Sequence, residues 1–384
     1  MNLAEIQQAL RDEQLDGWLF FDHHQRDALA YRVLGFTPEH MPTRRWYYLI
    51  PAHGDPVGLV HQIEPSMLNA LPGTKVAYAS WTRLLEHLQE LLAGRRRVAM
   101  QYSPNCAVPY VAMVDAGTVE LVRSLGVEVV TSANLVQFFE ARWNQQKLES
   151  HLEAGRRVDA IRRAAFQLAG ASTDEYQLQQ FILRRFKEEG LYTDHGPIVA
   201  VNANASNPHY EPTAEAHQSV RRGDVLLIDM WAKLDQAESV YYDITWVGYC
   251  GAEAPEAVRN VFGIVREARD RAVRCVQEAV ARGELLCGYQ VDDAARGYIR
   301  EQGYGDNFFH RTGHSIGADV HGTGANMDNL ETHDERRVIP WTCFSVEPGI
   351  YLPEFGIRSE VNVFVDETSA RVTGEVQQAV LSLA

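Results

Sequence analysis

Apolar runs and helical repeats alternate through the first third of the chain. Residues 17–21 (GWLFF), 46–50 and 97–100 are short apolar runs bounded by polar residues, which is typical of buried strands. Residues 3–14 and 84–93 repeat their apolar positions at helical spacing, and a glycine follows the second repeat. Strands and helices in turn predict an α/β layer for this part of the chain.

A charged, helix-favouring stretch at residues 145–168 follows. Its apolar positions are spaced for one helix face: Leu148, Leu152, Val158 and Ile161. We expect this helix to open the second of two domains, with the boundary near Asn144. The predicted domains are 1–144 and 145–384.

The second domain repeats one order of elements. Ser172-x-x-Glu175 is a capping-box signature for a helix that ends at Gly190. The remaining pattern predicts strands at 223–231 and 239–247, helices at 254–282 and 291–302, and strands at 342–347 and 357–365. Two successive units of two helices and a β-hairpin predict an α+β domain with an internal pseudo-twofold.

Composition and charge narrow the class of protein. The 384 residues are 46% hydrophobic and carry a net charge of −15, from 36 Lys and Arg against 51 Asp and Glu. This composition fits a globular chain and disfavours nucleic acid as a partner, because a phosphate backbone is bound chiefly by clustered basic residues. No apolar run is long enough to span a membrane, and the first ten residues do not resemble a signal peptide. We therefore expect a cytoplasmic protein with no membrane partner.

Five cysteines occur, and none forms a CxxC pair. An odd number at wide spacing predicts neither a disulfide framework nor a thiolate zinc site. We expect reduced thiols that are mainly in the core: Cys106, Cys250, Cys275, Cys287 and Cys343.

Acidic residues interrupt apolar strands at two neighbouring places. Asp229 lies in LLID and Asp243 in YYDIT, and each is seven residues from Gln236. A hairpin turning at Gln236 would set the two carboxylates opposite each other on one face. Buried carboxylates this close repel each other unless a cation lies between them. The alternative is that one Asp caps a turn and the other is solvated.

Further acids and histidines complete a candidate metal site. Glu347 and Glu360 also lie in apolar contexts, so four carboxylates would balance two divalent cations, and a neutral His314 would add a nitrogen ligand. His310 and His321 flank His314, and Arg311 at the second position excludes an HExxH zinc helix. Two ions held by bridging carboxylates can share and deprotonate one water, which implies hydrolysis.

Several motifs in order resemble one family. They are NASNPHY (204–210), Ile228-Asp229, Asp243-Ile-Thr, HRTGHSIGADVH (310–321), EPGIY (347–351) and GIRSE (356–360). With these motifs, residues 145–384 resemble the catalytic domain of the pita-bread metallopeptidases of the creatinase, aminopeptidase P and prolidase group. Residues 1–144 resemble the smaller N-terminal domain of the proline-specific and creatinase branches, most clearly at 31–36 (YRVLGF).

The resemblance implies roles for ten side chains. It implies that Asp229 and Asp243 hold one metal, that His314 and Glu347 complete the other, and that Asp243 and Glu360 bridge the two. It also implies that Glu347, His209 and His321 assist proton transfer or stabilise the intermediate. Substrate-binding roles fall to His209, His310, His321, Tyr351 and Arg358. Manganese suits this ligand set, and zinc or cobalt is compatible with it.

The resulting expectation is a homodimeric peptidase that cleaves Xaa-Pro dipeptides. One alternative is an aminopeptidase P that acts on longer peptides. Two others are a metal-free creatinase-like hydrolase and a non-enzymatic binding protein on the same fold. The chain departs from the family at Gly322, at Val361 and in a longer 229–243 connection, which leaves the substrate preference open.

Overall fold

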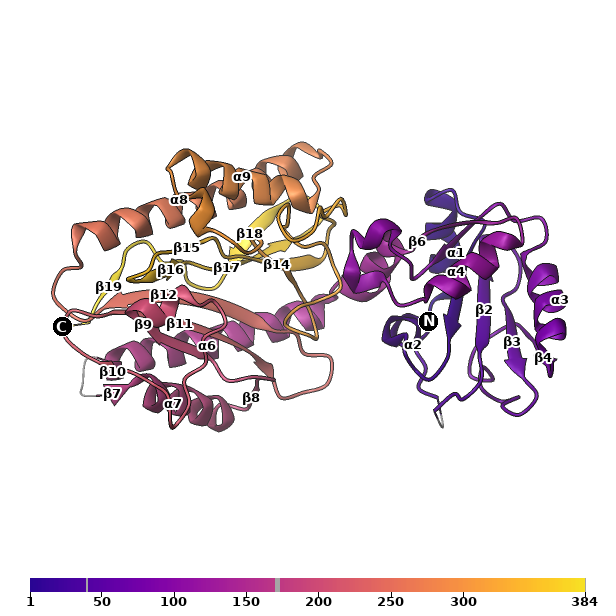
Figure 1. Ribbon diagram of the computed structural model, residues 1–384, viewed down its shortest axis with the longest axis horizontal. Helices are drawn as coiled ribbons and strands as arrows, with labels where there is room; N and C mark the ends of the chain where they lie inside the picture. The colour runs from indigo at the N-terminus through magenta and orange to yellow at the C-terminus, as the bar shows by residue number, and fades with distance from the viewer. Residues whose placement is uncertain (39–40, 170–172, 384) are drawn as a thin grey trace. The chain divides into compact units, whose positions relative to one another are not determined.

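The computed structural model describes residues 1–38, 41–169 and 173–383 (Figure 1). The chain forms two compact units, Met1–Glu140 and Ala141–Ala384. Within the described residues, no helix is long and apolar enough to cross a membrane.

The first unit is built around a six-stranded mixed sheet in the order β4-β3-β2-β1-β5-β6. Its strands are β1 (Gly17–Asp22), β2 (Trp46–Pro51), β3 (Val57–His61), β4 (Thr74–Tyr78), β5 (Arg97–Met100) and β6 (Glu128–Thr131). The helices are α1 (Leu3–Asp12), α2 (Ala28–Leu34), α3 (Trp81–Leu92), α4 (Ala116–Ser124) and α5 (Ala133–Val136). Two apolar clusters fill the two faces of this sheet, because β1 and β2 are buried on both sides. The predicted α/β layer is confirmed.

In the second unit, α6 and α7 lie on one side of the strands and α8 and α9 on the other (Figure 1). These helices are α6 (Gln145–Ala169), α7 (Glu175–Glu188), α8 (Glu256–Arg282) and α9 (Gly288–Glu301). The first half contributes β7 (Thr173–Asp174), β8 (Leu191–Tyr192), β9 (Ile198–Val201), β10 (Ser219–Val220), β11 (Val225–Leu234) and β12 (Tyr242–Tyr249). Each helix pair precedes an antiparallel strand pair, β11 with β12 and then β14 with β17. The predicted repeat of the element order is confirmed.

The second half divides its strands between two small sheets and one edge. Its strands are β13 (Ser315–Ile316), β14 (Thr342–Val346), β15 (Gly349–Tyr351), β16 (Gly356–Arg358), β17 (Val361–Val365), β18 (Ala370–Thr373) and β19 (Leu381–Ser382). The single strand expected at 357–365 is wrong, because β16 pairs with β15 while β17 pairs with β14. Glu360 lies between these two strands and is therefore free of either ladder.

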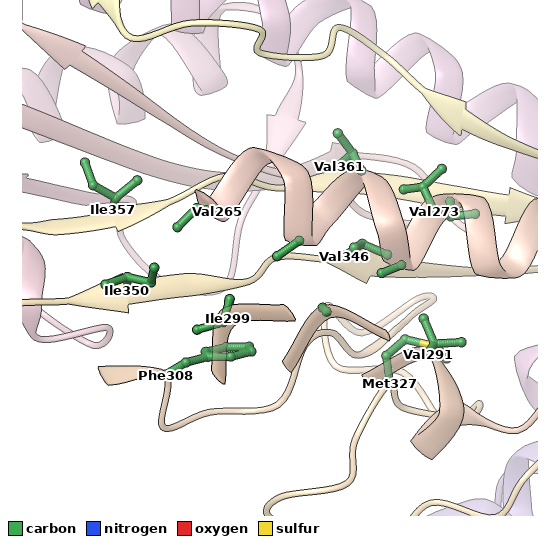
Figure 2. Packing of buried hydrophobic residues seen from close by; sticks show 14 of the residues in the cluster. Val265, Val273, Val291, Ile299, Phe308, Met327, Val346, Ile350, Ile357 and Val361 are labelled. Carbon is green, nitrogen blue, oxygen red and sulfur yellow. The ribbon is translucent and has the colours of Figure 1, made fainter. Parts of the chain in front are cut away.

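An apolar core fixes the strands of this half against α8 and α9 (Figure 2). Val265 of α8 and Ile299 of α9 pack in one buried cluster with Val346 and Val361 at the ends of β14 and β17. Burying one such side chain stabilises the fold by about 1.5–3 kcal/mol. The strand ends that carry Glu347 and Glu360 are thus held by the core.

The buried face of α6 differs by one position from the expected one. Leu148, Val158 and Ile161 are buried, but Leu152 is 43% exposed. The buried stripe runs instead through His151, whose ring nitrogens lie 2.6 Å from the Tyr241 carbonyl and 2.7 Å from the Thr373 hydroxyl. Position 151, three residues after Leu148, completes the face because it can satisfy both polar groups.

The first turn of α7 also differs from the prediction. Ser172 lies outside the described residues, and the N-cap is Asp174, whose carboxylate accepts from the Gln177 amide. Glu175 turns into the core instead of closing a capping box. Its carboxylate accepts hydrogen bonds at 2.6–2.9 Å from the groups of the 201–218 segment: Val201 N, Asn204 Nδ2, the Tyr210 hydroxyl and Gln218 N. Glu175 therefore holds the loop that carries His209.

The five cysteines are free. Cys250 and Cys343 are buried, Cys275 and Cys287 are half-buried, and Cys106 is exposed. The expected core position is thus wrong for Cys106, which lies in a surface turn at Pro104–Cys106.

Burial lowers the pKa of His151 to about 4. Because the unfolded chain takes up this proton near pH 6.5, the free energy of unfolding should be highest above that pH and should fall as the pH drops toward 4. We expect His151 to account for about 3 kcal/mol of that fall. Urea unfolding of His151→Gln at pH 4 and 7 should show a correspondingly smaller pH dependence, whereas exposed His53→Gln should match the parent chain. An unchanged pH dependence in His151→Gln would contradict this assignment.

Replacing Glu175 by Gln should destabilise the second unit. The NH2 group of the new side chain would face backbone N–H groups that now donate to the carboxylate, and it cannot accept from them. Buried N–H groups left without an acceptor cost about 1–3 kcal/mol. Urea unfolding should show this loss for Glu175→Gln, while Glu188→Gln at the exposed end of the same helix should change little. Equal stability of the two variants would show that the buried carboxylate does not hold the loop.

Candidate metal centre

The hairpin of β11 and β12 brings two acids to one face, in a register that differs from the expected one. Asp229 pairs with Thr245, and Asp243 pairs with Trp231. The prediction that the two acids are directly opposite is wrong, because the connection is centred on Ala237 and not on Gln236. The shift amounts to two residues along the strand, so Asp229 and Asp243 still share a face.

The second half supplies further ligand atoms to this face. Asp243, His314 and Glu360 each place one ligand atom within 4.8 Å of the others. The Nε2 atom of His314 lies 3.5 Å from Oδ2 of Asp243 and 3.3 Å from Oε1 of Glu347. The structure therefore brings together residues that are more than a hundred positions apart.

Ser345 aligns His314 with Glu347. Its hydroxyl accepts from the His314 amide at 2.9 Å and donates to Glu347 Oε1 at 3.0 Å. The approach needs a glycine at position 313, because a Cβ there would lie 1.9 Å from the Ser345 carbonyl oxygen. His314 Nδ1 lies 3.2 Å from the Ser315 carbonyl, which assigns the proton to Nδ1 and leaves Nε2 available as a ligand.

Thr245 and Asn362 orient the other acids. The Thr245 hydroxyl donates to Glu360 Oε2 at 2.9 Å. The Asn362 amide accepts from the Asp243 N–H at 3.1 Å and donates to the Asp243 carbonyl. Sequence reasoning missed both residues. The available signal was their position two residues after Asp243 and Glu360, which on a strand places them on the same face.

The charges of this cluster are poorly balanced by the protein alone. Asp229, Asp243 and Glu360 are 2–8% exposed, and each has one buried oxygen with no hydrogen-bond partner. Burial and the neighbouring Asp229 carboxylate raise the pKa of Asp243 well above its usual range, and burial and Asp243 do the same for Glu360. Unpaired carboxylate oxygens beside one imidazole are a donor set that fits divalent cations.

Arg358 is hydrogen-bonded to other side chains of the protein. Its guanidinium donates to Asp229 Oδ2 at 2.5 Å, to the Tyr351 hydroxyl at 3.0 Å and to the Thr245 hydroxyl at 3.0 Å. Arg358 is only 2% exposed. These contacts make it the partner of Asp229, and its predicted contact with substrate stays a prediction.

A hydrogen-bonded chain continues from Arg358 through Tyr351 to His310. The Tyr351 hydroxyl lies 2.7 Å from His310 Nε2, and His310 Nδ1 lies 2.7 Å from the Arg311 carbonyl. Burial and the Arg358 charge lower the pKa of His310 to about 3. A neutral His310 with its proton on Nδ1 can accept the Tyr351 hydroxyl proton, which directs the hydroxyl oxygen toward Arg358.

His321 and His209 lie on the open side of the cluster. The His321 ring meets the His314 ring edge to face, with centroids 4.4 Å apart. The charge of His314 and then burial lower the pKa of His321 to about 3, and His209 also contributes to this shift. Both His209 and His321 are exposed, so their imidazoles can meet a ligand that enters from solvent.

Comparison with known proteins finds relatives by sequence and by fold. An Xaa-Pro dipeptidase of Pyrococcus furiosus is 30% identical over 185 residues, and one of Lactobacillus helveticus is 32% identical over 203 residues. These alignments cover 48% and 53% of this chain, and the chain spans about half the length of each relative, 48% and 49%. The crystal structure of dipeptidase PepE from Mycobacterium ulcerans superposes with a TM-score of 0.69 at 20% identity, over 99% of this chain and 96% of that one.

The comparison of whole structures therefore shows a shared fold, and the family assignment comes from sequence. The sequence profile of metallopeptidase family M24 matches residues 149–367. This match covers more than half of the chain and includes all five acids and histidines of the cluster. The chain belongs to metallopeptidase family M24.

Proposed function

We propose that this protein is a metal-dependent peptidase that hydrolyses the Xaa-Pro bond of dipeptides. The observation that carries the proposal is the cluster of His314 with four carboxylates, three of which are buried and have one oxygen each that lacks a protein partner. The relatives named Xaa-Pro dipeptidase support the choice of substrate. An imide bond offers no N–H, so its recognition requires a dedicated site.

Two divalent ions are the proposed cofactor, held by Asp229, Asp243, His314, Glu347 and Glu360. Their four positive charges and that of Arg358 exceed the four carboxylate charges by one. The centre would therefore favour one further negative charge, as on a nucleophile or on the oxygen of a developing tetrahedral intermediate. Hard carboxylate oxygens with a single imidazole favour manganese, with zinc or cobalt as alternatives.

The side chains around the centre have separate proposed tasks. Bound cations would supply Lewis acidity and a more acidic water. Burial raises the pKa of Glu347, which suits a carboxylate that accepts and then returns a proton. Neutral His321 and exposed His209 can hydrogen-bond the substrate from the open side. Arg358 fixes Asp229, and Tyr351 and His310 fix Arg358.

Location and assembly belong to the same proposal. Five free cysteines support a reducing compartment such as the cytoplasm. A homodimer follows from the family resemblance, and Arg44 or Arg45 of a second copy would then be available as a cation for the substrate carboxylate.

Removing Asp243 should abolish metal binding. Asp243→Ala takes away the ligand expected to contact both ions, so we expect most of the metal and nearly all activity to be lost. Metal content by mass spectrometry after dialysis measures the first effect, and circular dichroism checks the fold. Asp235→Ala, in the exposed β11–β12 connection, is the matched control and should keep its metal. A folded Asp243→Ala protein with two tightly bound ions would refute the ligand assignment.

A hydrolysis panel tests the substrate. After chelation, the protein should cleave Ala-Pro and Leu-Pro only when manganese, zinc or cobalt is restored, and should leave Ala-Ala intact. Ala-Pro-Ala should be cleaved more slowly than Ala-Pro. Faster cleavage of the tripeptide would identify an aminopeptidase P activity, and activity that survives complete chelation would favour a metal-free hydrolase.

A further inference from the structure

A row of side chains leads across the sheet from the metal centre to the surface. Trp231 of β11 pairs with Asp243 of β12, so their side chains share a face. On the other side of β11, Lys233 pairs with Tyr192 of β8. Continuing that register by two residues sets Asp194 beside Trp231. The Trp231 indole N–H indeed donates to Asp194 Oδ1 at 2.9 Å.

Asp194 is an oriented carboxylate at the open end of this row. Its side chain is 36% exposed. Partial burial raises the pKa of Asp194, but the Trp231 indole and further hydrogen bonds outweigh that effect and keep the pKa below its usual value. Through Trp231, which pairs with Asp243 in the sheet and donates to Asp194, the carboxylate lies on the same face as Asp243. Asp194 therefore places a negative charge at the solvent end of the row that begins at Asp243.

No Lys or Arg of the described segments forms an ion pair with Asp194. The contact that could carry charge is His195, whose Nδ1 lies 3.3 Å from Oδ2 and whose side chain is 76% exposed. Lys233 is engaged elsewhere, since its Nζ donates to the Ala318 carbonyl at 2.6 Å and lies over the rings of Tyr192 and Tyr241. The Asp194 carboxylate thus has an indole to orient it and no strong cation to neutralise it.

We propose that Asp194, oriented by Trp231, binds a cationic group on the substrate residue that precedes the cleaved bond. This inference rests on the proposed peptidase function for the identity of that residue. A dipeptide is negatively charged at its carboxyl end and positively charged at its amino end, so a carboxylate at the rim attracts the amino side and repels the other. The flat ring of Trp231 beside the carboxylate also suits an ammonium or guanidinium group.

Two groups of a substrate carry this chemistry: the α-ammonium and the side chain of Lys or Arg. Three amides of one carbon skeleton separate them, because lysinamide has both ammonium groups, norleucinamide has the α-ammonium alone, and hexanamide has neither. Isothermal titration calorimetry of the metal-loaded protein gives a Kd for each. The variants are Asp194→Asn, Trp231→Phe, which keeps a ring but loses the indole N–H, and Asp235→Asn as the charge-matched control.

Asp194→Asn should weaken lysinamide binding by roughly two- to fivefold, as expected for a partly exposed charge pair. Trp231→Phe should weaken it by a smaller factor. Norleucinamide shows which ammonium group is bound. If Asp194→Asn weakens its binding as much as that of lysinamide, the α-ammonium is bound, and if its binding is unchanged, the basic side chain is bound. Hexanamide and Asp235→Asn should show no change. Lysinamide binding that is unaffected by Asp194→Asn, or equally affected by Asp235→Asn, would overturn the proposal.

Hydrolysis distinguishes failure of this inference from failure of the proposed function. Suppose that the metal-loaded protein cleaves Ala-Pro and that Asp194→Asn cleaves Lys-Pro and norleucyl-Pro with unchanged kcat/KM. The peptidase function would then be supported and the Asp194 site refuted. If no Xaa-Pro peptide is cleaved but Asp194→Asn still raises the Kd of the amides, the cation site would be supported and the peptidase proposal refuted.

Discussion

Electrostatic repulsion among buried carboxylates is the constraint on which the second unit depends. Asp229, Asp243, Glu347 and Glu360 converge where water cannot fully solvate them, and Arg358 is the cation that the protein itself places against them. Burying like charges at this density costs several kcal/mol for each uncompensated ion. The cluster is thus built for cations from outside the chain, and the surrounding packing must hold the acids together without them.

That packing comes from both halves of the unit. The two Asp residues belong to the hairpin of β11 and β12, whereas His314, Glu347 and Glu360 lie at the ends of short strands in the second half. Neither half holds a full ligand set. The core under α8 and α9 fixes the strand ends, and small polar groups then set the direction of each ligand atom. The positions of the ligand atoms, to about an ångström, depend on these hydrogen bonds from neighbouring polar groups.

The candidate metal ligands and the proposed cation site occupy different parts of one face. The buried end of the row across β11 is the candidate metal ligand Asp243, and the exposed end is the Asp194 carboxylate. Trp231 lies between them and contacts Asp194 through a single hydrogen bond. A substitution at position 194 could therefore alter the charge that this face attracts without moving the candidate ligands. Glu175, in contrast, must hold its loop rigidly to keep His209 in place.

The sequence by itself determined the α/β character of the first unit, the repeated order of helix pairs and strand pairs in the second unit, and the residue types of the candidate metal centre. These features depend on local periodicity and on acids that interrupt apolar strands, and both can be seen within ten or so residues. The exact pairing of Asp229 with Thr245, the exposure of Leu152, the N-cap at Asp174 and the Asp194 contact were decided only by the tertiary structure. Strand register and buried polar partners depend on groups distant in the chain, because the free energy of such a contact exists only once both partners are packed together.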